Sequence, residues 1–328
     1  MSPPTTGTSA AAEEYVLLDD GSLVLHLPAA YLPLARHWLP LLPYASRRAR
    51  PDAARICIAG GAGGAAGTEP ADLRLGTVSA WIRSDEVFMR GRHGCITQVD
   101  LAAGRALITP GVPGQAAPWE VHASITLTLA LLLGRDGRAL LHAAGPVAPD
   151  GRGWLLVGDA RAGKTTTCVN LVRAGWSFAS DDNVVLSRDA AGGLRFEGLP
   201  RRFHVDTGLG RGIPSGERGA EDPHANWTGR WIATAPAAGI FLPHVAAESP
   251  TRVERVSAGE ALNGLIRQSP WLVADRVAAP AVLDLLKEVA ALPAFTLRLG
   301  LDTFAAPSIL AERLEPALAG GRSLRGAP

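Results

Sequence analysis

The stretch Gly153–Leu186, which reads GWLLVGDARAGKTTTCVNLVRAGWSFASDDNVVL, decides the fold. Its apolar start, residues 154–157, predicts a buried strand, and the segment that ends near Gly175 predicts a helix. Between them lies a loop of the form Gly-x-x-x-x-Gly-Lys-Thr, at residues 158–165. Strand, loop and helix therefore follow one another in the order that a phosphate-binding loop requires.

Backbone N–H groups of such a loop, together with the N-terminus of the next helix, attract phosphate oxygens. Lys164 is expected to reach the β- and γ-phosphates, and the Thr165 hydroxyl to bind Mg²⁺. Glycines are common here, but Lys164 and Lys287 are the only lysines, so the lysine is the stronger signal. The expected nucleotide-binding residues are Gly158, Asp159, Ala160, Arg161, Ala162, Gly163, Lys164, Thr165 and Thr166.

Two adjacent carboxylates, Asp181 and Asp182, follow the next apolar segment. One suits Mg²⁺, which takes carboxylate, hydroxyl and water oxygens; the other suits a base that accepts the proton of an attacking hydroxyl. Neighbouring residues of an extended chain point to opposite faces, but spacing alone does not say which faces the metal. We assign Asp181, with Thr165, to the metal and Asp182 to the base. The alternative is a pair that caps a turn before Asn183.

These residues resemble the kinase domain of HPr kinase/phosphorylase, whose core is shared with ATP-dependent phosphoenolpyruvate carboxykinase. The resemblance rests on GDARAGKTT at 158–166 and on WSFASDD at 176–182, and it extends less specifically over about 140–302. It implies an α/β kinase domain with a mixed sheet (α+β overall, with a smaller β-rich domain before it) and ATP and Mg²⁺ as cofactors.

The same resemblance places His142, on an expected strand at 139–144, beside the phosphates or the substrate hydroxyl. A hydrogen-bonded core histidine is the alternative. The catalytic set is then Asp182, Asp181, His142 and Lys164.

The sequence also departs from the family. Ala160 and Arg161 stand where relatives usually carry Ser-Gly, and the nearest counterpart of the Glu-Ile-Arg-Gly-Leu-Gly signature is TGLGRG at 207–212. These departures argue against HPr as substrate. They favour divergent relatives that modify ribosomally made peptides, such as lasso-peptide kinases that phosphorylate a serine.

Arginines follow the acidic pair along the chain. Arg201 and Arg202 could clamp the γ-phosphate charge, or could belong to a solvated loop. The Gly-rich segment 208–231 is expected to be a lid or a substrate-binding loop, with Arg211, Arg218 and Arg230 as the cations that would face phosphate.

The N-terminal part predicts a separate β-rich domain. A hairpin is expected over 15–27 and an antiparallel meander over 71–109, because short alternating runs are broken by turn residues. The Pro/Gly segment 110–118 is the expected boundary. The predicted organisation is a tail at 1–14, a β-rich domain at 15–115, a kinase domain at 116–320 that begins with a buried helix at 119–133, and a tail at 321–328.

The composition of the chain limits the classes of function that we expect. A net charge of +1 does not point to bulk binding of nucleic acid or anionic membrane, and no apolar run is long enough to cross a bilayer. Three distant cysteines and no secretory signal favour a cytoplasmic protein. Homo-oligomerisation and the choice between ATP and pyrophosphate stay open.

The function we expect is transfer of the γ-phosphate of ATP, with Mg²⁺, to a hydroxyl of a peptide or protein, most readily a serine. One alternative is a small-molecule kinase or carboxykinase-like enzyme. The other is a nucleotide-binding regulatory protein without phosphotransfer.

Overall fold

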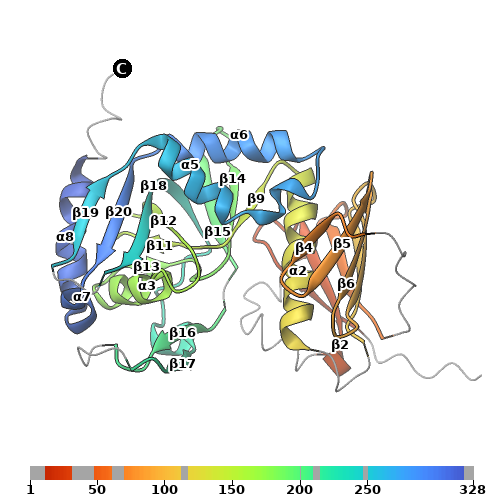
Figure 1. The fold of residues 1–328 in the computed structure, drawn as a ribbon, viewed down its shortest axis with the longest axis horizontal. Coiled ribbons are helices and arrows are strands. Elements are labelled where there is room, and N and C mark those ends of the chain that lie inside the picture. The colour runs from red at the N-terminus through yellow and green to blue at the C-terminus, as the bar shows by residue number, and fades with distance from the viewer. Residues whose placement is uncertain are drawn as a thin grey trace, which may run out of the picture. The chain divides into compact units, whose positions relative to one another are not determined.

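The computed structural model describes residues 12–31, 48–60, 70–111, 117–199, 201–209, 215–246 and 250–320. The chain forms two units, 1–135 and 136–328, and each has its own sheet (Figure 1). Among the described residues, none of the helices is both long enough and apolar enough to cross a membrane.

The first unit is built on one eight-stranded sheet in the order β1-β2-β3-β8-β7-β6-β5-β4. Strand β3 pairs in parallel with β2 and β8, and the other pairs are antiparallel. The elements are β1 Ala12–Val16, β2 Leu23–Pro28, the 3₁₀ turn η1 Ala29–Tyr31, β3 Ala54–Ile58, β4 Leu73–Leu75, β5 Val78–Arg83, β6 Glu86–Gly91, β7 Ile96–Asp100, β8 Arg105–Thr109 and α2 Pro118–Arg135. The hairpin and the meander predicted from the sequence are confirmed.

Helix α2 corrects the predicted domain boundary. It lies against β5, β6 and β8 and belongs to the first unit, so the division falls after Arg135 and not near 115. The sequence did not reveal this because α2 is apolar nearly all round, and such a helix shows no side on which it must pack. The predicted tail is also too long, because Ala12–Glu14 pair with β2; residues 1–11 and 321–328 lie outside the described part.

The second unit holds a ten-stranded mixed sheet and a separate two-stranded one. Its elements are β9 Ala139–Leu141, β10 Ala143–Ala144, β11 Pro146–Val147, β12 Gly153–Val157, α3 Lys164–Arg173, β13 Ser177–Phe178, β14 Val184–Arg188, β15 Leu194–Gly198, β16 Phe203–Asp206, β17 Arg218–Glu221, α4 Pro223–Asn226, β18 Thr234–Val245, β19 Arg252–Arg255, α5 Ala258–Arg267, η2 Pro270–Val273, α6 Ala279–Ala290, β20 Ala294–Leu299, α7 Leu301–Ala305 and α8 Pro307–Gly320.

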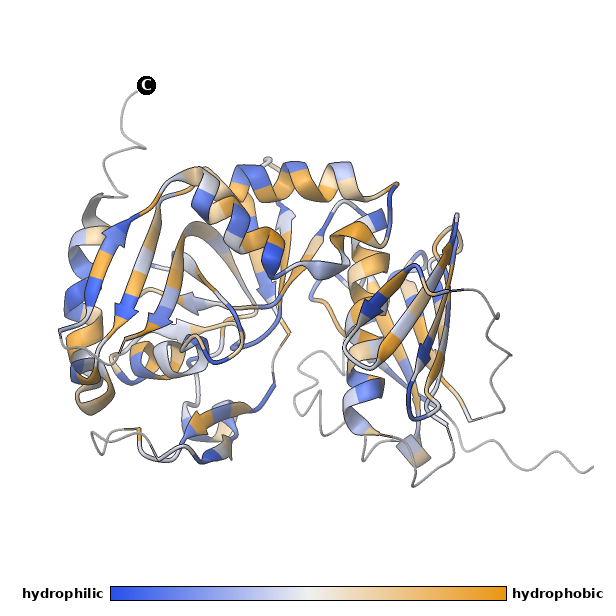
Figure 2. Cartoon of the chain, in the orientation of Figure 1, coloured by the Kyte–Doolittle hydropathy of each residue, from blue (hydrophilic) through white to orange (hydrophobic). Residues whose placement is uncertain are grey.

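Strand β12 shows why this unit has three layers. Its five residues are all buried, and alternate side chains enter opposite cores. Leu155 and Val157 pack in the core that α5 and α6 cover, whereas Trp154 and Leu156 pack in the core that α3 and α8 cover. Figure 2 shows the result: strands rich in apolar residues, and helices α5 and α6 with apolar and polar sides.

Strand β18 pairs with three other strands of the sheet. It pairs in parallel with β12 and β20 and, nearer its start, antiparallel with β15. Strand β13 runs in the same direction as β12, because β11 pairs antiparallel with both. The carboxyl ends of β12, β13 and β18 therefore meet at one edge of the sheet, which is where α/β folds place their ligands.

Gly239, in the middle of β18, gives a test of this packing. A Cβ there would lie 2.4 Å from Trp154 Cζ3 and 2.6 Å from the Pro293 carbonyl oxygen. We expect Gly239→Ala to lower the free energy of unfolding by about 1–3 kcal/mol, measured by urea denaturation. Gly219→Ala in β17 is the control, because its Cβ meets only Thr207 Cγ2, at 3.5 Å. Equal midpoints for the two variants would contradict this account.

Candidate functional site

The phosphate loop connects β12 to α3 and is shaped by two left-handed residues. Gly163, the N-cap of α3, has φ 102°, and Arg161 has φ 67°. The positive φ favours glycine at position 163, and a Cβ there would also displace the end of the Leu299 side chain, whose Cδ1 would lie 2.5 Å away. Arg161 occupies a backbone conformation that favours glycine.

Lys164 is buried and turns back over the loop. Its Nζ donates to the carbonyl oxygens of Gly158, at 2.6 Å, and Asp159, at 3.2 Å. Burial lowers the pKa of Lys164, while the carboxylates of Asp182, Asp159 and Asp181 oppose that shift in this order. The ammonium group therefore lies within the field of all three carboxylates.

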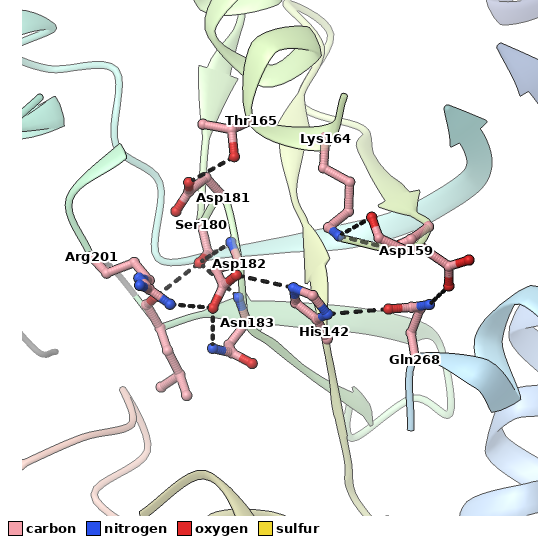
Figure 3. A network of polar contacts seen from close by, with 12 residues as sticks. His142, Asp159, Lys164, Thr165, Ser180, Asp181, Asp182, Asn183, Arg201 and Gln268 are labelled. Carbon is pink, nitrogen blue, oxygen red and sulfur yellow. Dashed lines mark hydrogen bonds and ion pairs between the residues drawn. The ribbon is translucent and has the colours of Figure 1, made fainter. Parts of the chain in front are cut away.

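Asp181 lies on the same side as the first turn of α3 (Figure 3). The Thr165 hydroxyl donates to its Oδ2 at 3.2 Å, and its Oδ1 is buried without a hydrogen-bond partner. Burial and the neighbouring Asp182 raise the pKa of Asp181 to about 8. A buried carboxylate with one unsatisfied oxygen and an adjoining hydroxyl is a donor set that Mg²⁺ fits.

Asp182 points the other way, toward His142 and Arg201 (Figure 3). Its Oδ1 contacts His142 Nε2 at 3.1 Å, and its Oδ2 accepts from Asn183 Nδ2 at 2.8 Å and from Arg201. The buried Ser180 hydroxyl holds the turn, because it accepts from the backbone N–H groups of Asp182 and Asn183. The two side chains therefore lie on different sides of the turn between β13 and β14, and not along an extended chain as expected from the sequence.

Strand register explains how His142 reaches Asp182. Strands β9 and β14 pair antiparallel with Leu141 opposite Val184, so the residue after β9 meets the residues before β14. On its other side, His142 Nδ1 lies 3.1 Å from Gln268 Oε1, and its backbone N–H donates to the Gln268 carbonyl oxygen. His142 is therefore hydrogen-bonded on both ring nitrogens beside the acidic pair.

Residues at the C-terminal end of α5 bind the phosphate loop through Asp159. Gln268 Nε2 donates to Asp159 Oδ1 at 2.9 Å, and Arg267 forms an ion pair with the same carboxylate. Sequence reasoning missed Gln268, Arg267, Asn183 and Ser180. Asn183 and Ser180 adjoin the acidic pair and could have been found there, whereas no motif marks Gln268 or Arg267.

A pocket of about 470 Å³ adjoins the loop. Loop residues 158–162 form one wall, and the end of β18, Thr296 of β20 and helix α5 form the rest. Leu242 and Pro243 supply apolar surface, and Asn263 supplies a polar group from α5. Its size lies within the range of small-molecule sites.

The predicted arginines have different positions. Arg201 pairs with Asp182, whereas Arg202 is exposed. Arg218, on β17, is close enough to lower the pKa of Lys164, and Arg230 donates to the Gly175 carbonyl oxygen at 2.7 Å. Arg211 lies outside the described residues. Of the segment proposed as a lid, residues 218–221 form β17, which pairs with β16.

The sequence matches no protein-family model and no curated protein sequence. Among solved structures, the chain is similar to the Hpr(Ser) kinase/phosphatase from Coxiella burnetii, with 12% identity and a TM-score of 0.33. The match covers 56% of this chain and 98% of that one.

The raised pKa of Asp181 predicts a pH effect on stability in metal-free buffer. The folded protein holds a proton that the unfolded chain, with an ordinary pKa of 3.8, releases. The bound proton stabilises the folded state fully below pH 3.8, and this stabilisation is lost as pH rises toward about 8. Asp181→Asn removes this pH dependence. As pH rises from 5 to 9, the melting temperature of wild type should therefore fall relative to that of the variant.

The control for this comparison is Asp284→Asn, which changes an exposed aspartate on α6. Its melting curve should follow that of wild type across the same range. Parallel pH profiles for wild type and Asp181→Asn would show that the Asp181 carboxylate is not held in its protonated form.

Proposed function

We propose that this protein is a cytoplasmic ATP- and Mg²⁺-dependent kinase that transfers the γ-phosphate to a hydroxyl, most readily a serine of a peptide. The observation that carries the proposal is the meeting of Lys164, the Thr165–Asp181 pair and Asp182 at one edge of the sheet. Three functions that phosphotransfer needs are thereby supplied within one site: a cation for phosphate, ligands for a metal and a base.

Each residue then has a defined task. The loop and Lys164 would bind the phosphates, and Thr165 and Asp181 would hold Mg²⁺, which supplies positive charge against the phosphate oxygens. Asp182 would accept the proton of the attacking hydroxyl as its oxygen bonds to the γ-phosphorus and the bond to ADP breaks. Most of the rate acceleration would come from positioning and charge neutralisation.

The acceptor side must be reachable by a side chain from solution. The side chains of His142, Asp182 and Arg201 are 33%, 26% and 22% exposed, in contrast to buried Asp181. A hydroxyl can therefore approach Asp182, while the metal site stays shielded. This difference supports a peptide or protein acceptor over a small molecule that is enclosed by the site.

The pocket beside the loop supports a nucleotide as donor. Pyrophosphate would occupy the loop alone, whereas the base and ribose of ATP would fill the space between α5 and the end of β18. Of the neighbouring carboxylates, Asp182 raises the pKa of Lys164 most, so Asp182 lies close to the loop. That arrangement favours an enzyme over a regulatory nucleotide-binding protein.

Two substitutions separate binding from chemistry. Lys164→Ala should weaken ATP binding by about tenfold or more, because a buried phosphate-facing cation is lost. The other lysine, Lys287, is exposed on α6, and Lys287→Ala should leave ATP affinity unchanged. Isothermal titration calorimetry with Mg·ATP measures both. Equal affinities for the two variants would remove the loop from the nucleotide site.

Asp182→Asn tests the chemical step. It should retain ATP affinity and lower transfer by about 10²–10⁴-fold, as expected for loss of a general base. The assay is transfer of labelled γ-phosphate to a peptide library with serine fixed at its centre, and a matched library with alanine is the blank. Undiminished transfer would exclude Asp182 as the base. Equal labelling of both libraries would exclude serine as the acceptor.

Asn263→Trp tests the donor. Asn263 is exposed on α5 and lines the pocket, so an indole there should obstruct the base and ribose without disturbing the core. We expect ATP affinity to fall by about tenfold and pyrophosphate affinity to stay unchanged. Ile266→Trp, at an exposed position of α5 outside the pocket, is the control. Unchanged ATP affinity in Asn263→Trp would place the nucleoside elsewhere.

A further inference from the structure

We propose that the side chain of Arg161 binds the α- and β-phosphates of the nucleotide, at the junction between the phosphate loop and the pocket; this inference rests on the proposed function. Arg161 is exposed, and it lines the pocket of about 470 Å³ with its neighbours in the loop. Lys164, the other cation of the loop, is not part of that lining and donates to the carbonyl oxygens of Gly158 and Asp159.

The backbone of the loop makes Arg161 an exception. The Ala162 N–H donates to the Asp159 carbonyl oxygen at 3.1 Å, which closes a four-residue turn with Arg161 as its third residue. Arg161 has φ 67°, whereas Ala160, the second residue, does not have a positive φ. This is the pattern of a type II turn, whose third residue is normally glycine or asparagine. The loop therefore holds a long side chain at a position where glycine is unstrained.

A second left-handed residue shows what is unusual about Arg161. Among the residues that the structure describes, Ser84 is the other non-glycine residue with a positive φ. Ser84 lies in the two-residue turn between β5 and β6, where left-handed residues are ordinary. Arg161 lies beside a ligand pocket instead, and strained residues in proteins gather at such sites. We therefore look for the function of Arg161 in its side chain.

The guanidinium group of Arg161 is available for an anion. Among the described residues, it has no ion-pair or hydrogen-bond partner. The other arginine that lines the pocket, Arg267, is paired with Asp159. The acidic side chain on the same wall, Glu260, accepts from Ser257 in the capping box of α5. Arg161 is thus the arginine of the pocket wall whose charge is left for a ligand.

The position of Arg161 indicates which part of the nucleotide it meets. In the proposed function the loop and Lys164 bind the β- and γ-phosphates, and the pocket holds the base and ribose. The α-phosphate then lies where the loop meets the pocket, and Arg161 belongs to both. A planar guanidinium group can donate two parallel hydrogen bonds to phosphate oxygens. The two phosphates that it would bridge remain with ADP after transfer, so ATP and ADP share this contact.

Two substitutions separate the charge from the turn. Arg161→Gly suits the left-handed turn, so its melting temperature should equal or exceed that of wild type. Arg161→Met keeps an unbranched side chain on the same backbone and removes the guanidinium group. Both variants should bind Mg·ATP and Mg·ADP about tenfold or more weakly than wild type, by a similar factor for the two nucleotides, in isothermal titration calorimetry.

The matched control is Arg173→Ala, which removes an exposed charge from the last turn of α3. It should bind both nucleotides as wild type does. If Arg161→Gly unfolds at a lower temperature than wild type, Arg161→Met decides the question, because methionine bears the same backbone strain as arginine.

Phosphorus-31 NMR locates the contact. In wild type and Arg161→Met, each saturated with Mg·ADP, the α- and β-phosphorus resonances should differ between the two proteins. Wild-type affinities in both variants would overturn the proposal. Weaker ATP binding with unchanged ADP binding would overturn it by placing Arg161 at the γ-phosphate, and unchanged phosphorus resonances would do so by placing it at the nucleoside. A wild type that binds neither nucleotide would refute the proposed function as well.

Discussion

The arrangement of the site depends on one costly feature, the buried carboxylate of Asp181. It lies at the edge of the core beside a second carboxylate, and one of its oxygens has no hydrogen-bond partner. Such a group is stable only with a proton or a cation, and its raised pKa expresses that requirement. The Thr165 hydroxyl donates a hydrogen bond to the other oxygen of this carboxylate. In the proposed function that cation is Mg²⁺, held beside the phosphate loop.

The different surroundings of the two adjacent aspartates follow from the turn between β13 and β14. Asp181 faces the helix that begins at Lys164, and Asp182 faces His142 and Arg201. Side chains of this one turn enter two environments, one buried and one partly open to solvent. Ser180 stabilises that turn through its hydroxyl. Metal binding and base catalysis would otherwise require two separate segments.

Much of this could be predicted because it is local in sequence. The loop, its helix and the two aspartates lie within one continuous stretch, and local periodicity fixes their order. The register between β9 and β14, Gln268 at the end of α5 and the position of α2 depend on contacts between distant segments. Buried all-apolar helices and single glutamines show no preferred partner in sequence, so only the folded chain reveals them. The opposed directions of Asp181 and Asp182 were predicted, but for an extended chain and not for the turn that holds them. Arg201 as the partner of Asp182 was not predicted.

The most direct test of the account is a crystal structure with Mn²⁺ and a non-hydrolysable ATP analogue. The account predicts an anomalous manganese peak in contact with Thr165 Oγ1 and Asp181, phosphates on the loop beside Lys164, and the γ-phosphate on the side of Asp182. A nucleotide bound elsewhere, or a metal that contacts neither Thr165 nor Asp181, would contradict it.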